Sequence, residues 1–280
     1  MNIIKEIEDL EGTHMKQRII SAIILALIAI PIFLIGGTVF NVTFYVVAIL
    51  GLREFMKVKT KEKEFPDFIQ FIAYIMLTLI YFNNTLKSDL IFYIDYRIVA
   101  GLFLVLFIPV ILYHNPKEYN IKDAFYLLGG VFFLGSSMSL FYTYRCIGLD
   151  LIVYLLLITI LTDTFALFTG MLIGKTKLLS DISPNKTWEG SIGGSLIATF
   201  VCTVFYITVI NPSISLFEIT LTTLFLTIIG QFGDLFFSAI KRKFNVKDFS
   251  NLIPGHGGVL DRLDSIIFVM LMYTFFIGII

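Results

Sequence analysis

Charged residues that could bind phosphate gather in one short stretch of this chain, from Ser238 to Asp264. The stretch combines basic residues, a glycine-rich turn and two carboxylates: Lys241, Arg242, Lys243, Lys247, Gly255, Gly257, Gly258, Asp261 and Asp264. Glycine backbone lets phosphate oxygens approach closely, Lys and Arg neutralise them, and carboxylates recruit the divalent metal that nucleotides carry. The stretch therefore predicts a polyanion site, with a charged loop at a membrane surface as the alternative.

A second stretch, Ser183 to Gly194, reads S-P-N-K-T-W-E-G-S-I-G-G. The side chains of Ser183, Lys186 and Thr187 can donate hydrogen bonds to phosphate, and the ring of Trp188 can stack on a base or lie at a membrane interface. The glycines allow the next helix to start close to its neighbours. An interfacial tryptophan at an ordinary helix start is the alternative.

Three acidic residues, Asp163, Asp234 and Asp261, lie within apolar sequence or at its edge. A charge in hydrocarbon costs at least ~2.5 kcal/mol on insertion scales, so each is a candidate functional residue. The alternative is a carboxylate that is satisfied by a neighbouring lysine or serine.

The elements that must position these residues are membrane helices. The 280 residues are 57% hydrophobic and 15% charged, and their mean hydropathy is +0.88, which is too apolar for a soluble globule. The 21 basic and 21 acidic residues balance, which excludes nucleic-acid binding by bulk charge. Cys146 and Cys202 lie in or near apolar segments and favour buried thiols over a disulfide framework.

Nine apolar segments are each near the ~20 residues that cross a bilayer. They are Ile19–Ile35, Val39–Leu52, Pro66–Phe82, Ile98–Tyr113, Ala124–Tyr144, Leu151–Ile173, Ser191–Ile210, Leu216–Ile240 and Leu263–Ile280. Residues 1–17 predict a short interfacial helix, and Leu90–Ile94 a surface or re-entrant piece. The fold class is therefore an all-α, polytopic integral membrane protein with about nine transmembrane helices, forming a single membrane domain over residues 1–280.

The basic residues predict the orientation of these spans. All but three of the 21 Lys and Arg fall on one side of a nine-span topology, the exceptions being Lys87, Arg97 and Arg145. Because positive charge is retained on the cytoplasmic side, the amino terminus and both phosphate-binding stretches are expected to face the cytoplasm.

The stretch from 238 to 264 resembles the signature of the CTP:phosphatidate cytidylyltransferases, or CDP-diacylglycerol synthases. That pattern runs Ser, an apolar residue, Lys-Arg, Lys-Asp, a small residue, Pro-x-His-Gly-Gly and Asp-Arg-x-Asp. Its positions are matched by Ser238, Ile240, Lys241, Arg242, Lys247, Asp248, Ser250, Pro254, His256, Gly257, Gly258, Asp261, Arg262 and Asp264. The second stretch resembles the family's Ser-Pro-Lys-Lys-Thr-Trp-Glu-Gly block.

The chain departs from the family pattern at a few positions. Asn185 replaces the first of the paired lysines, and Phe237 stands where an acidic residue often follows Gly-Asp-Leu. Phe165 and Leu167 replace a Gly and a Tyr common after the Asp-Thr of the sixth span. These departures put secondary contacts in doubt and leave the signature intact.

The resemblance implies that CTP and phosphatidate are converted to CDP-diacylglycerol and pyrophosphate in phospholipid biosynthesis. It implies Mg²⁺ held by Asp234 and Asp261, with Lys247, Arg262 and Asp264 as further catalytic residues. The implied substrate-binding residues are Asp163, Ser183, Lys186, Thr187, Lys241, Arg242, His256, Gly257 and Gly258.

His256 invites a catalytic-base interpretation because it lies beside two glycines. The attacking phosphate monoester is already anionic near pH 7, with a second pKa of ~6, so no proton need be abstracted. Phosphate binding or loop positioning is therefore the role we expect for His256.

The expected partners are CTP, phosphatidate and the membrane, and no nucleic-acid partner is expected. Both a homodimer and a monomer are compatible with the sequence. The expected location is the plasma membrane. A CTP-dependent polyprenol kinase or a CDP-archaeol synthase is the alternative enzyme. An anionic-solute transporter is disfavoured, because transport predicts a midplane site and inverted repeats.

Overall fold

The computed structural model describes residues 2–60, 62–85 and 95–277, and within them it contains nine α-helices. These are α1 Asn2–Ile35, α2 Gly37–Lys59, α3 Asp67–Thr85, α4 Tyr96–Leu112, α5 Ile121–Ile147, α6 Leu149–Ile173, α7 Trp188–Phe205, α8 Leu216–Lys243 and α9 Leu260–Tyr273. A π-helical turn, Tyr206–Ile210, continues α7.

The helices follow the predicted apolar segments one for one. Five are long and apolar enough to cross a membrane, namely α2, α5, α6, α7 with its π-helical turn, and α8. Shorter apolar helices cover Ile19–Ile35, Asp67–Asn83 and Tyr96–Leu112. A helical membrane protein is thus confirmed, while nine crossings stay a prediction.

Two predictions concern segments outside the main bundle. Residues 2–17 are helical, but they continue into the first apolar segment as one helix, α1, rather than forming a separate piece. Their place at the membrane interface stays a prediction. The short apolar run Leu90–Ile94 lies outside the described residues.

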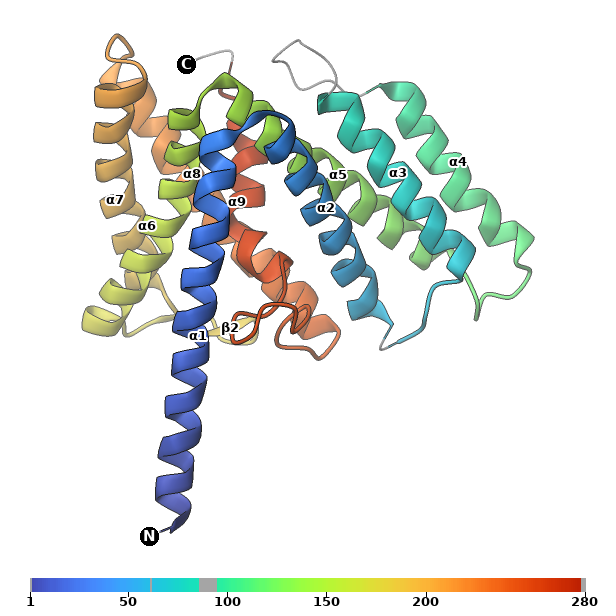
Figure 1. The fold of residues 1–280 in the computed structure, drawn as a ribbon, viewed down its shortest axis with the longest axis horizontal. Helices are drawn as coiled ribbons and strands as arrows, with labels where there is room; N and C mark the ends of the chain where they lie inside the picture. Colours follow the sequence, from blue (N-terminus) through green and yellow to red (C-terminus); the bar gives the residue numbers. More distant parts are fainter. Residues whose placement is uncertain (1, 61, 86–94, 278–280) are drawn as a thin grey trace.

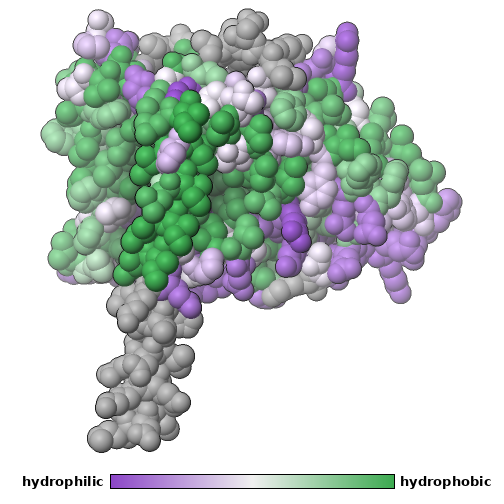
Figure 2. Space-filling view, in the orientation of Figure 1, coloured by the Kyte–Doolittle hydropathy of each residue, from purple (hydrophilic) through white to green (hydrophobic). Residues whose placement is uncertain are grey.

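The connections that carry the candidate site lie at one edge of the molecule. Figure 1 shows the α6–α7 and α8–α9 connections at its lower edge, with the α2–α3 and α4–α5 connections beside them, while the amino-terminal part of α1 projects beyond this edge. Hydrophilic side chains gather along this edge in Figure 2, and apolar side chains cover the face above it. This polarity is typical of a bundle whose one end meets water.

Helix α5 forms the centre of the bundle. Its Leu134, Met138 and Phe141 are fully buried, and the Phe141 ring stacks on Phe44 of α2 at 4.5 Å between centroids. At its lower end Asp123 pairs with two lysines of the α2 end, Lys59 and Lys63. The buried face of α5 therefore ties the amino-terminal helices to the carboxyl-terminal ones.

Helices α6 and α7 approach each other closely because glycines face α6. A Cβ on Gly190 would lie 2.6 Å from the carbonyl oxygen of Ala166, and one on Gly194 would lie 2.6 Å from that of Thr162. Small residues four apart allow such helix contact in membranes. The close approach brings the start of α7 beside Asp163.

The connection between α6 and α7 is a short β-hairpin rather than the loop that the sequence predicts. Strand β1, Lys177–Leu179, pairs antiparallel with β2, Ser183–Thr187. The Thr187 side chain then caps α7 by accepting from the Gly190 amide at 3.1 Å. This hairpin is the small exception to an all-α fold.

Candidate active site

Lys186 and Asp234 form the ionic pair at the centre of the candidate site. The Lys186 ammonium, on β2, lies 2.5 Å from a carboxylate oxygen of Asp234 on α8. One helical turn on, the Ser238 hydroxyl donates to the other oxygen of Asp234 at 3.3 Å. Both side chains of the pair are about one-quarter exposed, at 24% and 26%, but the Lys186 nitrogen itself is buried.

Two further carboxylates lie close to this pair. The charges of Asp163 on α6 and Asp264 on α9 each interact with that of Asp234, and with each other. Lys186 acts on Asp163, and Lys241 acts on Asp264. Like charges in one site repel, so the two lysines offset a concentration of negative charge drawn from three helices.

A cavity of about 540 Å³ opens where α6, the hairpin and α8 meet. We call it the polar cavity because charged and polar side chains contribute to its wall. Its polar lining consists of Asp163, Lys177, Asn185, Lys186, Thr187, Ser191, Gln231 and Asp234. This volume is within the range of small-molecule sites. The cavity therefore joins four residues that the sequence assigned to substrate or metal binding, namely Asp163, Lys186, Thr187 and Asp234.

Asp261 organises the signature loop between α8 and α9. One carboxylate oxygen lies 2.7 Å from the Lys241 ammonium, and the other accepts from the amides of Phe249 at 2.8 Å and Gly258 at 2.9 Å. Gly257 has φ +83° and a Cβ there would lie 2.8 Å from Asp261, which accounts for glycine at this position.

The two arginines of the signature hold loop backbone. Arg262 donates twice to the carbonyl oxygen of His256, at 2.8 and 2.6 Å. Arg242 donates to the carbonyl oxygen of Ile182, in the hairpin turn, at 3.3 Å and to the carbonyl oxygen of Val246 at 3.1 Å. The arginines therefore link the loop to itself and to the hairpin.

The remaining predicted site residues lie in the signature loop and at the far end of the hairpin. Lys247 is exposed, and Ser183 pairs with Leu179 at the end of the hairpin away from Thr187. The His256 ring nitrogen Nδ1 lies 2.7 Å from the Ser21 hydroxyl of α1. The Ser21 hydroxyl also lies 2.9 Å from the Pro254 carbonyl oxygen. Both contacts join the signature loop to α1, and the role of His256 in phosphate binding or loop positioning stays a prediction.

The structure adds a residue that sequence reasoning missed, Glu54 of α2. It is 4% exposed and accepts from the Ser250 hydroxyl at 2.6 Å and from the amides of Val259 and Leu260, each at 2.9 Å. A carboxylate at a helix start satisfies amides without intrahelical partners. A Cβ on Gly258 would lie 2.6 Å from it. Glu54 therefore fixes where the signature loop ends and α9 begins.

Removing this carboxylate is expected to loosen the start of α9. Glu54→Ala loses charge-assisted hydrogen bonds worth about 1.5 to 3 kcal/mol, so the amides of Val259 and Leu260 should exchange roughly 10- to 150-fold faster. Hydrogen–deuterium exchange read by mass spectrometry measures this. Glu64→Ala is the control because Glu64 is exposed. Unchanged protection at residues 259 and 260 would contradict the assigned role.

Comparison with known proteins agrees with this arrangement. Residues 16–280 match the model of the cytidylyltransferase family. The chain is 36% identical to the phosphatidate cytidylyltransferase of Staphylococcus haemolyticus over 257 residues, which cover 91% of this chain and 96% of the relative. It is 33% identical to the phosphatidate cytidylyltransferase of Bacillus subtilis over 260 residues, covering 91% and 95%. With its signature carboxylates and lysines assembled at one edge of a helical membrane bundle, this chain belongs to the cytidylyltransferase family.

Proposed function

We infer that this protein is a phosphatidate cytidylyltransferase, which converts CTP and phosphatidate into CDP-diacylglycerol and pyrophosphate. The observation that carries this function is the Lys186–Asp234 pair in a polar cavity, beside two more carboxylates. Such a site combines a cation for phosphate with carboxylates for a metal, as nucleotidyl transfer requires. The whole-length similarity to enzymes of that name supports the same activity.

The chemistry needs positioning more than proton transfer. A phosphate oxygen of phosphatidate forms a bond to the α-phosphorus of CTP, and the bond from that phosphorus to the pyrophosphate oxygen breaks, in line. Lys186 and Lys177 at the cavity would bind and orient phosphate oxygens. Because the nucleophile is already an anion, catalysis rests on orientation and charge stabilisation.

We propose Mg²⁺ as the cofactor, and the donors of the site fit it. The partly exposed carboxylate of Asp234 lines the cavity, and oxygen ligands are what Mg²⁺ prefers. Within the described residues no three acidic, His or Cys side chains already converge as a ligand set. One or two carboxylates and substrate phosphates would therefore share the ion, which when bound offsets phosphate charge.

The second carboxylate has two candidates. Asp261, implied by the family resemblance, engages Lys241 and two loop amides, so it must exchange one of these contacts to bind a metal. Asp264 interacts with Asp234 electrostatically and accepts only from its neighbour Ser265, at 2.8 Å, among the contacts described. We propose Asp234 as the principal ligand, with Asp261 or Asp264 as the second.

The activity is tested with purified protein, phosphatidate and Mg²⁺, supplied with each of the four nucleoside triphosphates in turn. We expect that, of the four nucleotides, CTP is the one that supports pyrophosphate release, and that CDP-diacylglycerol is the lipid product. Release of nucleoside diphosphate with a phosphorylated lipid would instead assign a kinase.

We propose further that the chain crosses the plasma membrane nine times, with its amino terminus and site in the cytoplasm. The basic residues support this orientation, and so does the position of the hairpin and the signature loop at the edge from which the amino-terminal part of α1 projects (Figure 1). A homodimer stays a prediction.

Single cysteines test this orientation in a Cys146→Ser background, because Cys146 is exposed and Cys202 buried. A cysteine at Lys177, in the hairpin, should be shielded from a membrane-impermeant thiol reagent in intact cells. One at Ser213, in the α7–α8 connection, should react. Both positions are exposed in the fold. Labelling at residue 177 without labelling at residue 213 would show the opposite orientation, with the site outside the cytoplasm.

A further inference from the structure

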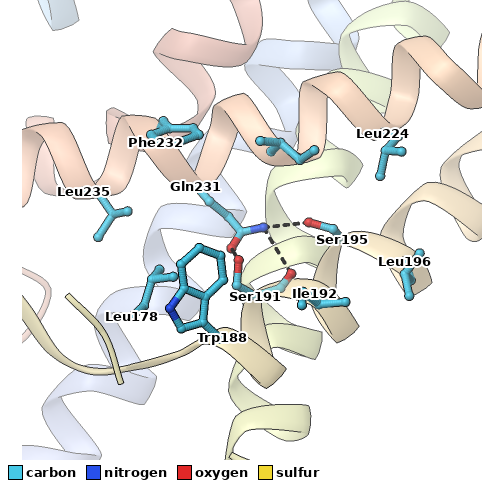
Figure 3. Close-up of a pocket in the computed structure, with 11 residues that line it drawn as sticks. Leu178, Trp188, Ser191, Ile192, Ser195, Leu196, Leu224, Gln231, Phe232 and Leu235 are labelled. Atoms are coloured by element: carbon cyan, nitrogen blue, oxygen red, sulfur yellow. Dashed lines mark hydrogen bonds between the residues drawn. The ribbon is translucent and has the colours of Figure 1, made fainter. Parts of the chain in front are cut away.

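A second cavity, largely apolar, lies between α7 and α8 beside the polar one. It has a volume of about 400 Å³. Figure 3 shows Ile192 and Leu196 of α7 facing Leu224 and Phe232 of α8, with Trp188 near one end. We call it the α7–α8 groove.

The groove opens toward the surface that a membrane would cover. Its rim residues Ile192, Leu196 and Phe232 are more than half exposed, at 56%, 59% and 58%, and Trp188 is 52% exposed. All four lie on helices long and apolar enough to cross a bilayer. A hydrocarbon chain could therefore enter the groove sideways from the bilayer without passing through water.

The groove and the polar cavity share a wall. Ser191 and Gln231 line both. The Ser191 hydroxyl donates to the Gln231 side-chain oxygen at 2.5 Å, and the Gln231 amide nitrogen donates to Ser195 at 2.7 Å and to the Ser191 carbonyl at 3.3 Å. Gln231 is 6% exposed. These bonds, dashed in Figure 3, form a fixed polar boundary between an apolar and a charged compartment.

This arrangement matches a molecule with a phosphate at one end and a hydrocarbon chain at the other. We propose that the α7–α8 groove binds an acyl chain of the phosphatidate substrate, with the ester-linked glycerol at the Ser191–Gln231 boundary and the phosphate toward Lys186. The proposal rests on the proposed function and specifies where the lipid part of that substrate lies. Along α8 the groove runs from Leu224 to Leu235, about 16 Å at 1.5 Å per residue.

The only tryptophan of the chain, Trp188, reports on the groove directly. The protein is placed in phosphatidylcholine vesicles that contain either phosphatidate or phosphatidylcholine with brominated acyl chains, at equal low mole fraction. Because Trp188 lines the groove, brominated phosphatidate should quench its fluorescence about twofold more than brominated phosphatidylcholine. Adding unbrominated phosphatidate should remove this extra quenching, because it competes with brominated phosphatidate for the groove. Equal quenching by the two lipids means ordinary bilayer lipid only and overturns the proposal.

Filling the groove tests the same proposal by kinetics. Leu224→Trp narrows it and should raise the KM for long-chain phosphatidate about tenfold, while the KM for CTP and the activity on short-chain phosphatidate stay within about twofold. Phe225→Trp is the matched control, because Phe225 is the next residue, is 46% exposed and lies outside the groove. Equal loss on both chain lengths, or no loss on either, would overturn the assignment.

The two assays separate this proposal from the proposed function. Fluorescence quenching needs no turnover, so selective quenching in a protein that releases no pyrophosphate would leave the lipid site standing and reject the reaction. CTP-dependent pyrophosphate release with equal quenching by both lipids would keep the reaction and reject the groove.

Discussion

Replacing Asp234 by Asn is expected to abolish turnover at every pH, with a loss of at least about 10³-fold in kcat. The amide keeps the shape of the side chain but removes the charge that pairs with Lys186 at 2.5 Å and that we assign to the metal. Two phosphate-bearing substrates repel each other strongly in a partly dry site, and neutral oxygen ligands offset that charge poorly. Pyrophosphate release from purified protein across the pH range measures the loss.

The matched comparison is Lys186→Ala, which removes the other half of the pair. The variant should lose a charge-assisted hydrogen bond to phosphate, worth about 1.5 to 3 kcal/mol. Its kcat/KM should therefore fall roughly 10- to 150-fold. Both variants should elute from size exclusion in detergent as the wild type does. If Asp234→Asn retains activity within tenfold of the wild type while Lys186→Ala is inactive, the Asp234 carboxylate is not required for catalysis.

The second large effect is expected for Asp261→Asn. Both oxygens of this carboxylate accept hydrogen bonds, from Lys241 on one side and from the amides of Phe249 and Gly258 on the other. An asparagine must turn its NH₂ group toward one of these donors. Its side chain is only 4% exposed, and a broken buried pair costs about 3 to 5 kcal/mol. This cost falls on the stability of the loop, and because turnover needs an ordered loop, turnover should fall by at most roughly 150- to 5,000-fold.

Titration with Mg²⁺ then separates the two roles that Asp261 could have. Activity of Asp261→Asn that returns as Mg²⁺ is raised identifies a metal ligand. Activity that stays low at every Mg²⁺ concentration identifies an organiser of the loop, which is the result we expect from its contacts. His256→Gln serves as the control in the same loop, because glutamine keeps a hydrogen bond toward Ser21 but cannot titrate. It should retain measurable activity, and an inactive His256→Gln beside an active Asp261→Asn would make the histidine the catalytic centre.

The sequence predicts the helices well because each is an uninterrupted apolar run bounded by charge. Within the described residues all nine helices overlap the predicted segments. The proximity of Asp163 to Asp234 was foreseeable in part, since both carboxylates lie in apolar helices and charged groups in hydrocarbon gather around water or ligands. Lys186 comes from the hairpin, and its pairing with Asp234 needed the structure.

Other features depend on pairings that sequence spacing does not encode. The β-hairpin forms between K-L-L, which is only three residues long, and S-P-N-K-T, which lacks the alternation of a typical strand. Glu54 lies among Arg53 and Lys57, so it reads as an ordinary surface charge, and its partners are about 200 residues later. Gln231 looks like one polar residue in an apolar helix until α7 places Ser191 and Ser195 opposite it.

The contact between Glu54 and the start of α9 also dictates when the site can exist during synthesis. Glu54 and Leu260 are 206 residues apart, so the contact that ends the signature loop cannot form until the last helix leaves the ribosome. Contacts so distant in sequence form late, after local helices. A chain still being inserted would carry most of the phosphate-binding residues but no ordered signature loop. We therefore expect nascent and carboxyl-terminally truncated chains to leave CTP untouched, so that catalysis begins only in a finished protein.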